Sequence, residues 1–203
     1  MVYVGSARTN EYGQGEGGEP GDQTGRECMI EPWYLHDLGW YVLRPLNQSK
    51  AKEIAQDMIY LCYNDNIGYS YWIHAHDLYN IVKHLNFNCS LVQIPCETDC
   101  AQAVRVCACY AGYDVPDFTT STEVEVFMEL GGFSLLTSDY YCAIPDHLEV
   151  GDILVTRTMG HTVVVVSTDT MPPDPGSGGS VRRCNVSRNC VLCGLCIFGK
   201  KSR

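Results

Sequence analysis

The chain has 203 residues and a formal net charge of −10 at pH 7, with 45% hydrophobic and 19% charged residues. This length supports one hydrophobic core with a short appendage, and the negative charge argues against a general affinity for nucleic acid or anionic lipid. No apolar run is long enough to span a bilayer, and residues 1–21 lack the apolar core of a signal peptide. We therefore expect synthesis in the cytoplasm without a leader and no insertion into a membrane.

The predicted elements begin after a polar, glycine-rich segment, residues 1–25, which is expected to be a loop. Apolar residues at helical spacing predict helices over about residues 49–63, 76–85, 99–111 and 122–130. Thr122 and Glu125 have the spacing of a capping box at the start of the last helix. Short segments rich in β-branched residues then predict strands over residues 133–136, 152–156 and 162–167. The expected order is helices first and sheet second.

A linker rich in Pro, Gly and Ser covers residues 172–180, so we place the end of the folded domain, residues 1–171, at this point. A basic, cysteine-rich tail over residues 181–203 follows. Its four cysteines could bind a structural zinc ion, form disulfides or do neither: Cys184, Cys190, Cys193 and Cys196. Most of the other eight cysteines of the chain are expected to be reduced and to pack as small hydrophobic side chains.

Cys100 and His161 are the candidate nucleophile and general base. Asp99 is a good helix N-cap, which places Cys100 in the first helical turn, where free backbone N–H groups stabilise a thiolate. The same N–H groups can hold the oxyanion of a tetrahedral intermediate. His161 lies between Gly160 and an all-valine strand that would fix its imidazole. A cysteine at a helix start followed by a histidine at a strand start is typical of papain-like cysteine hydrolases.

Three sequence blocks resemble those of the NlpC/P60 superfamily of peptidoglycan hydrolases: residues 97–104, 148–154 and 160–164. In the first block, Ala101 and Gln102 replace the serine and glycine of the usual motif. Three N-terminal blocks resemble a phage endolysin branch of that superfamily: residues 17–27, 40–44 and 66–69. The resemblance implies an α+β, papain-like NlpC/P60 fold with a helical N-terminal half packed on a small antiparallel sheet.

The resemblance also implies roles for residues around the cysteine. Asp169 is the nearest candidate for the third residue that orients the imidazole, and Gln23 is a candidate oxyanion donor. Asp22, Tyr69 and Asp99 are expected to line the substrate site. Two alternatives stay open: the loop around Gln23 could be a structural turn, and Tyr69 could be a core residue.

His74, His76 and Asp77 are residue types that bind zinc. Because no further ligand or catalytic carboxylate follows at the spacing of a zinc peptidase, the sequence favours a helix-capping role for them.

Together these features predict a bacteriolytic phage endolysin that cleaves an amide bond of bacterial peptidoglycan through a thioester, without a cofactor. The bond is either within the stem peptide (endopeptidase) or between stem and sugar (N-acetylmuramoyl-L-alanine amidase). The enzyme would act at the cell wall after its release from the host cytoplasm. Three alternatives share the fold: an inactive wall- or metal-binding module, an interbacterial toxin and an acyltransferase.

Overall fold

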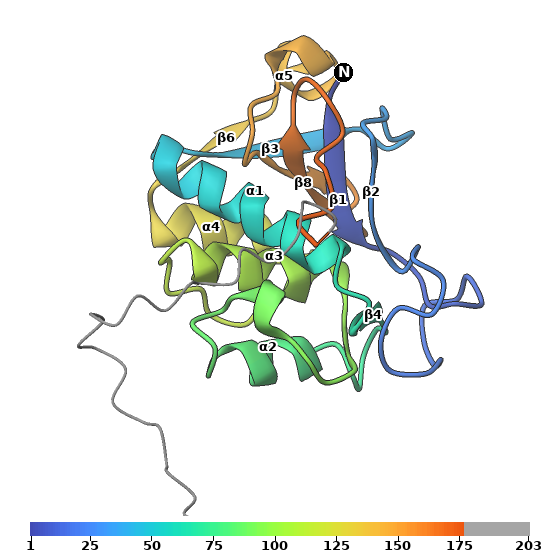
Figure 1. The fold of residues 1–203 in the computed structure, drawn as a ribbon. Coiled ribbons are helices and arrows are strands. Elements are labelled where there is room, and N and C mark those ends of the chain that lie inside the picture. The colour runs from blue at the N-terminus through green and yellow to red at the C-terminus, as the bar shows by residue number, and fades with distance from the viewer. Residues whose placement is uncertain (177–203) are drawn as a thin grey trace, which may run out of the picture.

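The computed structural model describes residues 1–176, which form an α+β domain around a six-stranded antiparallel sheet (Figure 1). The strand order is β2-β1-β8-β7-β3-β6. Their bounds are β1 Tyr3–Ala7, β2 Cys28–Pro32, β3 Trp40–Pro45, β6 Phe133–Leu136, β7 Ile153–Thr156 and β8 Thr162–Ser167. The central strand β8 pairs with β1 on one side and β7 on the other, so the segment that follows His161 lies in the middle of the sheet.

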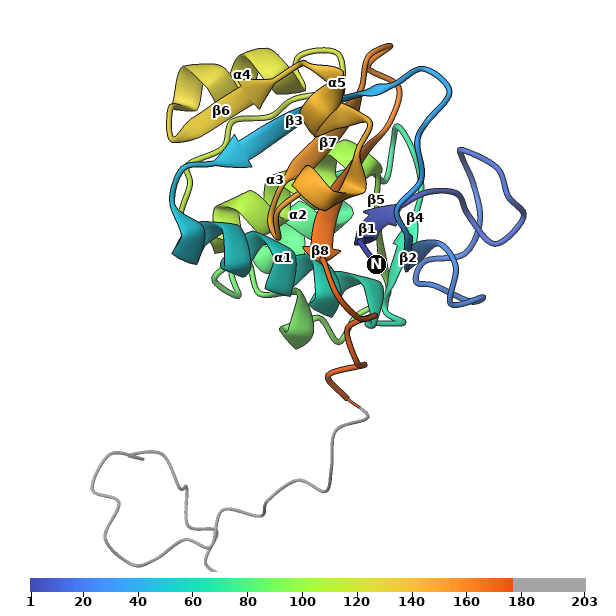
Figure 2. The same ribbon diagram turned by 90° about the horizontal axis from the view of Figure 1, so that it is seen from above.

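Most of the helices lie on one side of this sheet, and the short helix that contains Cys142 packs against the other face (Figures 1 and 2). The α-helices are α1 Gln48–Cys62, α2 Asp77–Val82, α3 Cys100–Tyr110, α4 Glu123–Leu130 and α5 Asp139–Cys142, and two short 3-10 helices are η1 Cys89–Leu91 and η2 Pro145–His147. A separate parallel pair, β4 Ile67–Tyr69 and β5 Cys96–Thr98, leads directly into α3. The first residue of α3 therefore lies at the edge between this pair and the helix layer.

Alternating side chains of β8 divide the core into two parts. Val164 and Val166 face the helices and pack in the cluster that contains Met58 of α1 and Val104 of α3. Val163 and Val165 face the other way and pack in the cluster that contains Trp40. Each residue of β8 thus belongs to one face or the other, and a shift of one position changes its neighbours completely.

The expected helices and the three expected strands are present, and the α+β class with an antiparallel sheet is confirmed. The expected order is wrong, because β1, β2 and β3 all precede the first helix. The N-terminal loop expected over residues 1–25 contains β1, whose hydrogen bonds come from β2 and β8, far away in the sequence. Gly5 weakens the local strand signal, but α1 packs so closely there that an added Cβ would lie 2.7 Å from the Met58 side chain.

The capping box expected at the start of α4 does not form. Thr122 is the N-cap residue, but its side chain makes no capping hydrogen bond and instead donates to the Thr119 carbonyl oxygen. The tail cysteines Cys184, Cys190, Cys193 and Cys196 lie outside the described residues. The eight cysteines within residues 1–176 are free thiols, and seven are buried, as expected for packing residues. None of the described helices combines the length and apolarity needed to cross a bilayer.

Candidate active site

Cys100 is the first residue of α3, and Asp99 caps this helix as expected. The Asp99 carboxylate accepts a hydrogen bond of 2.7 Å from the Gln102 backbone N–H, so one free N–H of the first turn is satisfied. Asp99 and Cys100 are each 9% exposed. The cap thus fixes the cysteine at a helix start, but in a nearly dry environment.

This environment does not favour the thiolate. Burial, followed by the negative charges of Asp99 and Glu123, raises the pKa of Cys100 to about 12. The backbone groups of Thr162 and Ala101 act on the thiol in the opposite direction and favour the anion, but more weakly. The expectation that the helix start lowers the pKa of Cys100 is therefore wrong for this structure, and the thiol is protonated at neutral pH.

Glu123, the first residue of α4, is the buried carboxyl beside this thiol. It is fully buried, and its Oε1 atom accepts a hydrogen bond of 2.8 Å from the Thr162 hydroxyl. Its Oε2 atom is buried without a partner, and burial raises its pKa well above the usual value. Glu123 was not predicted from the sequence, although it lies four residues before the buried Phe127 and so on the same helix face.

His161 lies directly before Thr162, and the two residues have different surroundings. The Thr162 side chain faces Glu123 on the helix side, so alternation along the strand directs His161 toward the opposite face. There the charges of Arg8 and His36 act on the ring, and together with burial they lower its pKa to about 4. The Nε2 atom of His161 is buried without a hydrogen-bond partner. The backbone of β8 thus contacts the thiol, while the imidazole is neutral and lies on the other face.

Asp169 is not brought to His161. It follows the far end of β8, whose 6 residues alone put roughly 20 Å of extended chain between it and the histidine. Its carbonyl oxygen accepts a hydrogen bond of 3.0 Å from the N-terminal amine of Met1. Asp169 therefore cannot orient the imidazole in this structure.

Gln23 and Asp22 belong to a turn at the other end of the β4–β5 pair. The Gln23 side chain donates to the Pro20 carbonyl oxygen at 3.1 Å. The Asp22 backbone N–H donates to Asp65, ahead of β4, whereas Cys100 follows the end of β5. The carboxylate of Asp22 accepts hydrogen bonds from five backbone N–H groups, those of Thr24, Gly25, Arg26, Glu27 and Cys28. The structural-turn alternative therefore describes this loop better than a role at the thiol.

Tyr69 does lie near the thiol. It ends β4 opposite Thr98, and it is 8% exposed. Burial is the main cause that raises its pKa, and the neighbouring Cys100 and Asp99 act in the same direction. Of the expected substrate-site residues, Tyr69 and Asp99 are thus placed beside Cys100.

A groove of about 310 Å³ opens next to the start of α3. Its lining residues are Tyr71, Trp72, Ile73, Ala75, His76, Asp99, Gln102, Asp117, Phe118 and Thr119. Trp72 and Ile73 are 67% and 77% exposed, which is unusual for side chains of this size. The groove therefore combines exposed apolar side chains with the cap of the cysteine helix.

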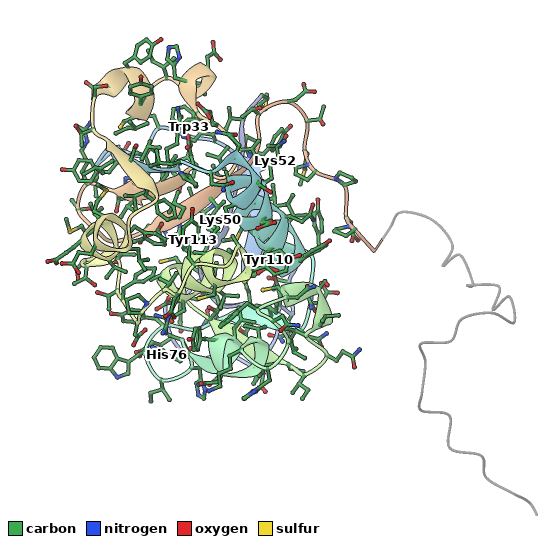
Figure 3. The ribbon with its side chains drawn as sticks, turned by 90° about the vertical axis from the view of Figure 1, so that its left-hand side faces the viewer. Trp33, Lys50, Lys52, His76, Tyr110 and Tyr113 are labelled. Carbon is green, nitrogen blue, oxygen red and sulfur yellow. The ribbon has the colours of Figure 1, made fainter. Side chains whose placement is uncertain are left out.

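Asp117 organises the polar side of the groove. Its carboxylate accepts hydrogen bonds from Gln102 at 2.9 Å and Arg105 at 3.0 Å, and it contacts the Nε2 atom of His76 at 3.1 Å. These contacts lower its pKa even though burial acts in the other direction. His76 lies near the α2 end of the molecule (Figure 3). It is a second imidazole close to the cysteine helix, and its charge also acts on Asp99.

Comparisons with known proteins place this arrangement in a family. Neither the curated proteins nor the solved structures gave a match to the chain. A family model described as endolysin-like domain matches residues 4–172, which include every described residue discussed above as part of the site. The chain therefore belongs to the endolysin-like domain family.

Proposed function

We propose that this protein hydrolyses an amide bond of bacterial peptidoglycan with Cys100 as nucleophile. Membership in the endolysin-like family supports a lytic function at the cell wall. The observation that carries the assignment to Cys100 is its place at the capped start of α3, beside the backbone of Thr162 and next to an open groove. Helix starts of this kind supply the N–H groups that a thioester mechanism needs.

The reaction begins when the Cys100 thiol transfers its proton to a base and the sulfur attacks the amide carbonyl. Free N–H groups of the first turn of α3 hold the oxyanion. The tetrahedral intermediate then expels the amine, which takes the proton back from the base and leaves a thioester. Water, deprotonated by the same base, cleaves the thioester and regenerates the thiol.

His161 is the proposed base. Its ring is neutral at physiological pH because its pKa is lowered to about 4, so it can accept a proton. Its Nε2 atom has no hydrogen-bond partner to lose when the ring turns, and the backbone of the next residue lies beside the thiol. The ring must leave the side of Arg8 and His36 when substrate binds, which makes the free enzyme a resting state.

Glu123 is a positioning residue in this scheme. Because it accepts a hydrogen bond from the Thr162 hydroxyl, it fixes the stretch of backbone that lies beside the thiol. The groove provides the substrate site: the exposed Trp72 and Ile73 suit the apolar faces of sugars and stem peptides. Gln102 and Asp117 supply polar contacts along the same groove.

Mass spectrometry of digested peptidoglycan tests the proposal. Purified walls of several chemotypes would be incubated with the wild-type protein, with Cys100→Ala and with Cys109→Ala. Cys109 is the matched control, because it lies on the same helix and is 8% exposed. We expect new fragments from the wild type and from Cys109→Ala only, and their masses name the bond. Equal digestion by Cys100→Ala would overturn the assignment.

A second candidate is a wall-binding module without hydrolytic activity, which the raised pKa of Cys100 favours. In that case no wall would be digested, while wild type and Cys100→Ala would bind walls equally and Trp72→Ala would bind more weakly. Acyl transfer on the same thioester would instead attach the acyl product to an added amine.

A further inference from the structure

A second cluster of reactive side chains lies where the start of α2 meets β5, outside the thiol site. His74, Asp77 and Glu97 each offer one ligand atom, and these atoms all lie within 4.8 Å of one another. His74 Nδ1 and Asp77 Oδ2 are 2.9 Å apart. The three residues come from the turn before α2, its first helical residue and the middle of β5, so the fold brings them together.

The helix-capping role expected for these residues is wrong. His76 is the N-cap residue of α2 but makes no side-chain capping hydrogen bond. Its ring contacts Asp117, whereas the His74 ring contacts the Asp77 side chain. The histidine rings are thus directed at carboxylates, and only His74 belongs to the cluster with Glu97.

Glu97 is the buried floor of this cluster. It is 3% exposed, and the negative charges of two further carboxylates, Asp77 and Glu11, disfavour its ionised form. The groups that favour its charge are the His74 ring and the Ser70 hydroxyl, neither of which is a permanent cation. The Oε2 atom of Glu11 is itself buried without a hydrogen-bond partner. A buried carboxylate in such surroundings is costly unless a cation compensates it.

The ligand set indicates the class of ion. One imidazole nitrogen and two carboxylate oxygens suit Zn²⁺ and Mn²⁺ better than Ca²⁺ or Mg²⁺, which prefer oxygen ligands alone. Ligands about 2.1 Å from a tetrahedral zinc ion lie about 3.4 Å from one another, so small side-chain rotations would close the site. The His74 and Asp77 side chains are 54% and 43% exposed, so an ion could enter from solvent.

We propose that His74, Asp77 and Glu97 bind a divalent transition-metal ion of the zinc class. The ion would hold in place the turn over residues 71–76, which lines the groove beside Cys100. This turn contains Trp72, whose φ of +72° is unusual for a large side chain and is retained only where the surroundings impose it. The proposal goes beyond hydrolysis, because metal binding needs neither Cys100 nor peptidoglycan.

Calorimetric titration with Zn²⁺ tests the site. The parent for these measurements is the full chain with Cys184, Cys190, Cys193 and Cys196 changed to Ser, because tail thiols would otherwise compete for the ion. Glu97→Gln and His74→Ala are introduced into this parent, with His76→Ala as the matched control from the same turn. Circular dichroism verifies that each variant is folded.

We expect one Zn²⁺ per parent chain, more than about tenfold weaker binding in Glu97→Gln and His74→Ala, and unchanged binding in His76→Ala. Zn²⁺ at about 100 times its Kd should raise the Tm of the parent by about 5–10 °C. A parent that binds no Zn²⁺, or variants that bind as tightly as the parent, would overturn the proposal.

Tryptophan fluorescence reports on the turn itself. Zn²⁺ should change the emission of the parent, and Trp72→Phe should remove this change while leaving the calorimetric binding intact. Binding without any change that depends on Trp72 would contradict the role of the ion in holding the turn. Because these measurements use no wall substrate, their failure is distinguishable from failure of the proposed hydrolysis.

Discussion

The two faces of β8 place neighbouring residues in different electrostatic environments. On the helix face, Thr162 joins Glu123 and Cys100, two acidic groups whose pKa values burial raises. On the other face, His161 lies among basic groups, and burial keeps its imidazole unprotonated. Residues adjacent in the sequence therefore lie in separate environments, each of which disfavours the charged form of its groups. A thiol and an imidazole in these states must meet before they can exchange a proton.

Of the substitutions that test this difference between the two faces, removal of the proposed base should have the largest effect on activity. His161→Ala should lower the rate of wall hydrolysis by about 10²–10⁴-fold, the usual contribution of a general base. The measurement is the initial rate of fragment release, with His76→Ala as the control for the second imidazole near α3. If His76→Ala lost the activity and His161→Ala kept it, the base would belong to the groove side instead.

Changes on the helix face should act on stability. Glu123→Ala removes the acceptor of the buried Thr162 hydroxyl and should cost about 1–3 kcal/mol, whereas Glu123→Gln can keep that hydrogen bond and should cost less. Urea unfolding at one pH measures both. Equal losses in the two variants would show that the hydrogen bond to Thr162 contributes little.

The two faces should also differ in the sign of their pH dependence. Glu123 has a raised pKa in the folded state, so its contribution is complete below its unfolded value of 4.5 and is lost as pH rises toward the folded pKa. His161 has a lowered pKa, so its contribution is present above 6.5 and is lost as pH falls to about 4.

Unfolding free energies from pH 4 to 8 separate these two effects. Relative to wild type, Glu123→Gln should gain stability as pH rises, and His161→Gln should gain up to about 3 kcal/mol as pH falls from 6.5 to 4. Curves parallel to that of the wild type would contradict the burial of either group.

The smallest expected effect lies in the groove. Trp72→Ala should raise KM for soluble wall fragments by a few-fold to about tenfold with little change in kcat, because the exposed ring contributes contact area and not chemistry. Steady-state kinetics measure this split. A fall in kcat at constant KM would assign Trp72 to the catalytic step.

Local signals in the sequence predicted much of this fold. Asp99 before an apolar helical stripe identified the start of α3, and the run of β-branched residues identified β8. β1 was not predicted because its hydrogen bonds come from other strands, of which β8 lies near the end of the domain. Gly5 also interrupts the alternation of side chains that would indicate a strand. Whether His161 or Thr162 faces the thiol depends on the register of β8, which residue types alone do not fix.

The same distinction applies to the candidate site. Asp99 directly precedes Cys100, so its place followed from the local sequence, whereas Tyr69 reaches Cys100 through the pairing of β4 with β5. Glu123 joins them only through its hydrogen bond to Thr162, and Glu97 joins His74 only through the packing of α2 on β5. Asp169 was assigned by nearness in sequence, and the extended strand carries it beyond the opposite end of β8.

Trapping of the acyl-enzyme tests the central claim most directly. Wild-type protein would be quenched with acid during digestion of soluble wall fragments and mapped by peptide mass spectrometry. The thioester mechanism predicts an acyl mass on the peptide that contains Cys100, lost on treatment with hydroxylamine and absent from Cys100→Ala, which should release no fragments. Fragment release by Cys100→Ala at the wild-type rate would contradict Cys100 as the nucleophile.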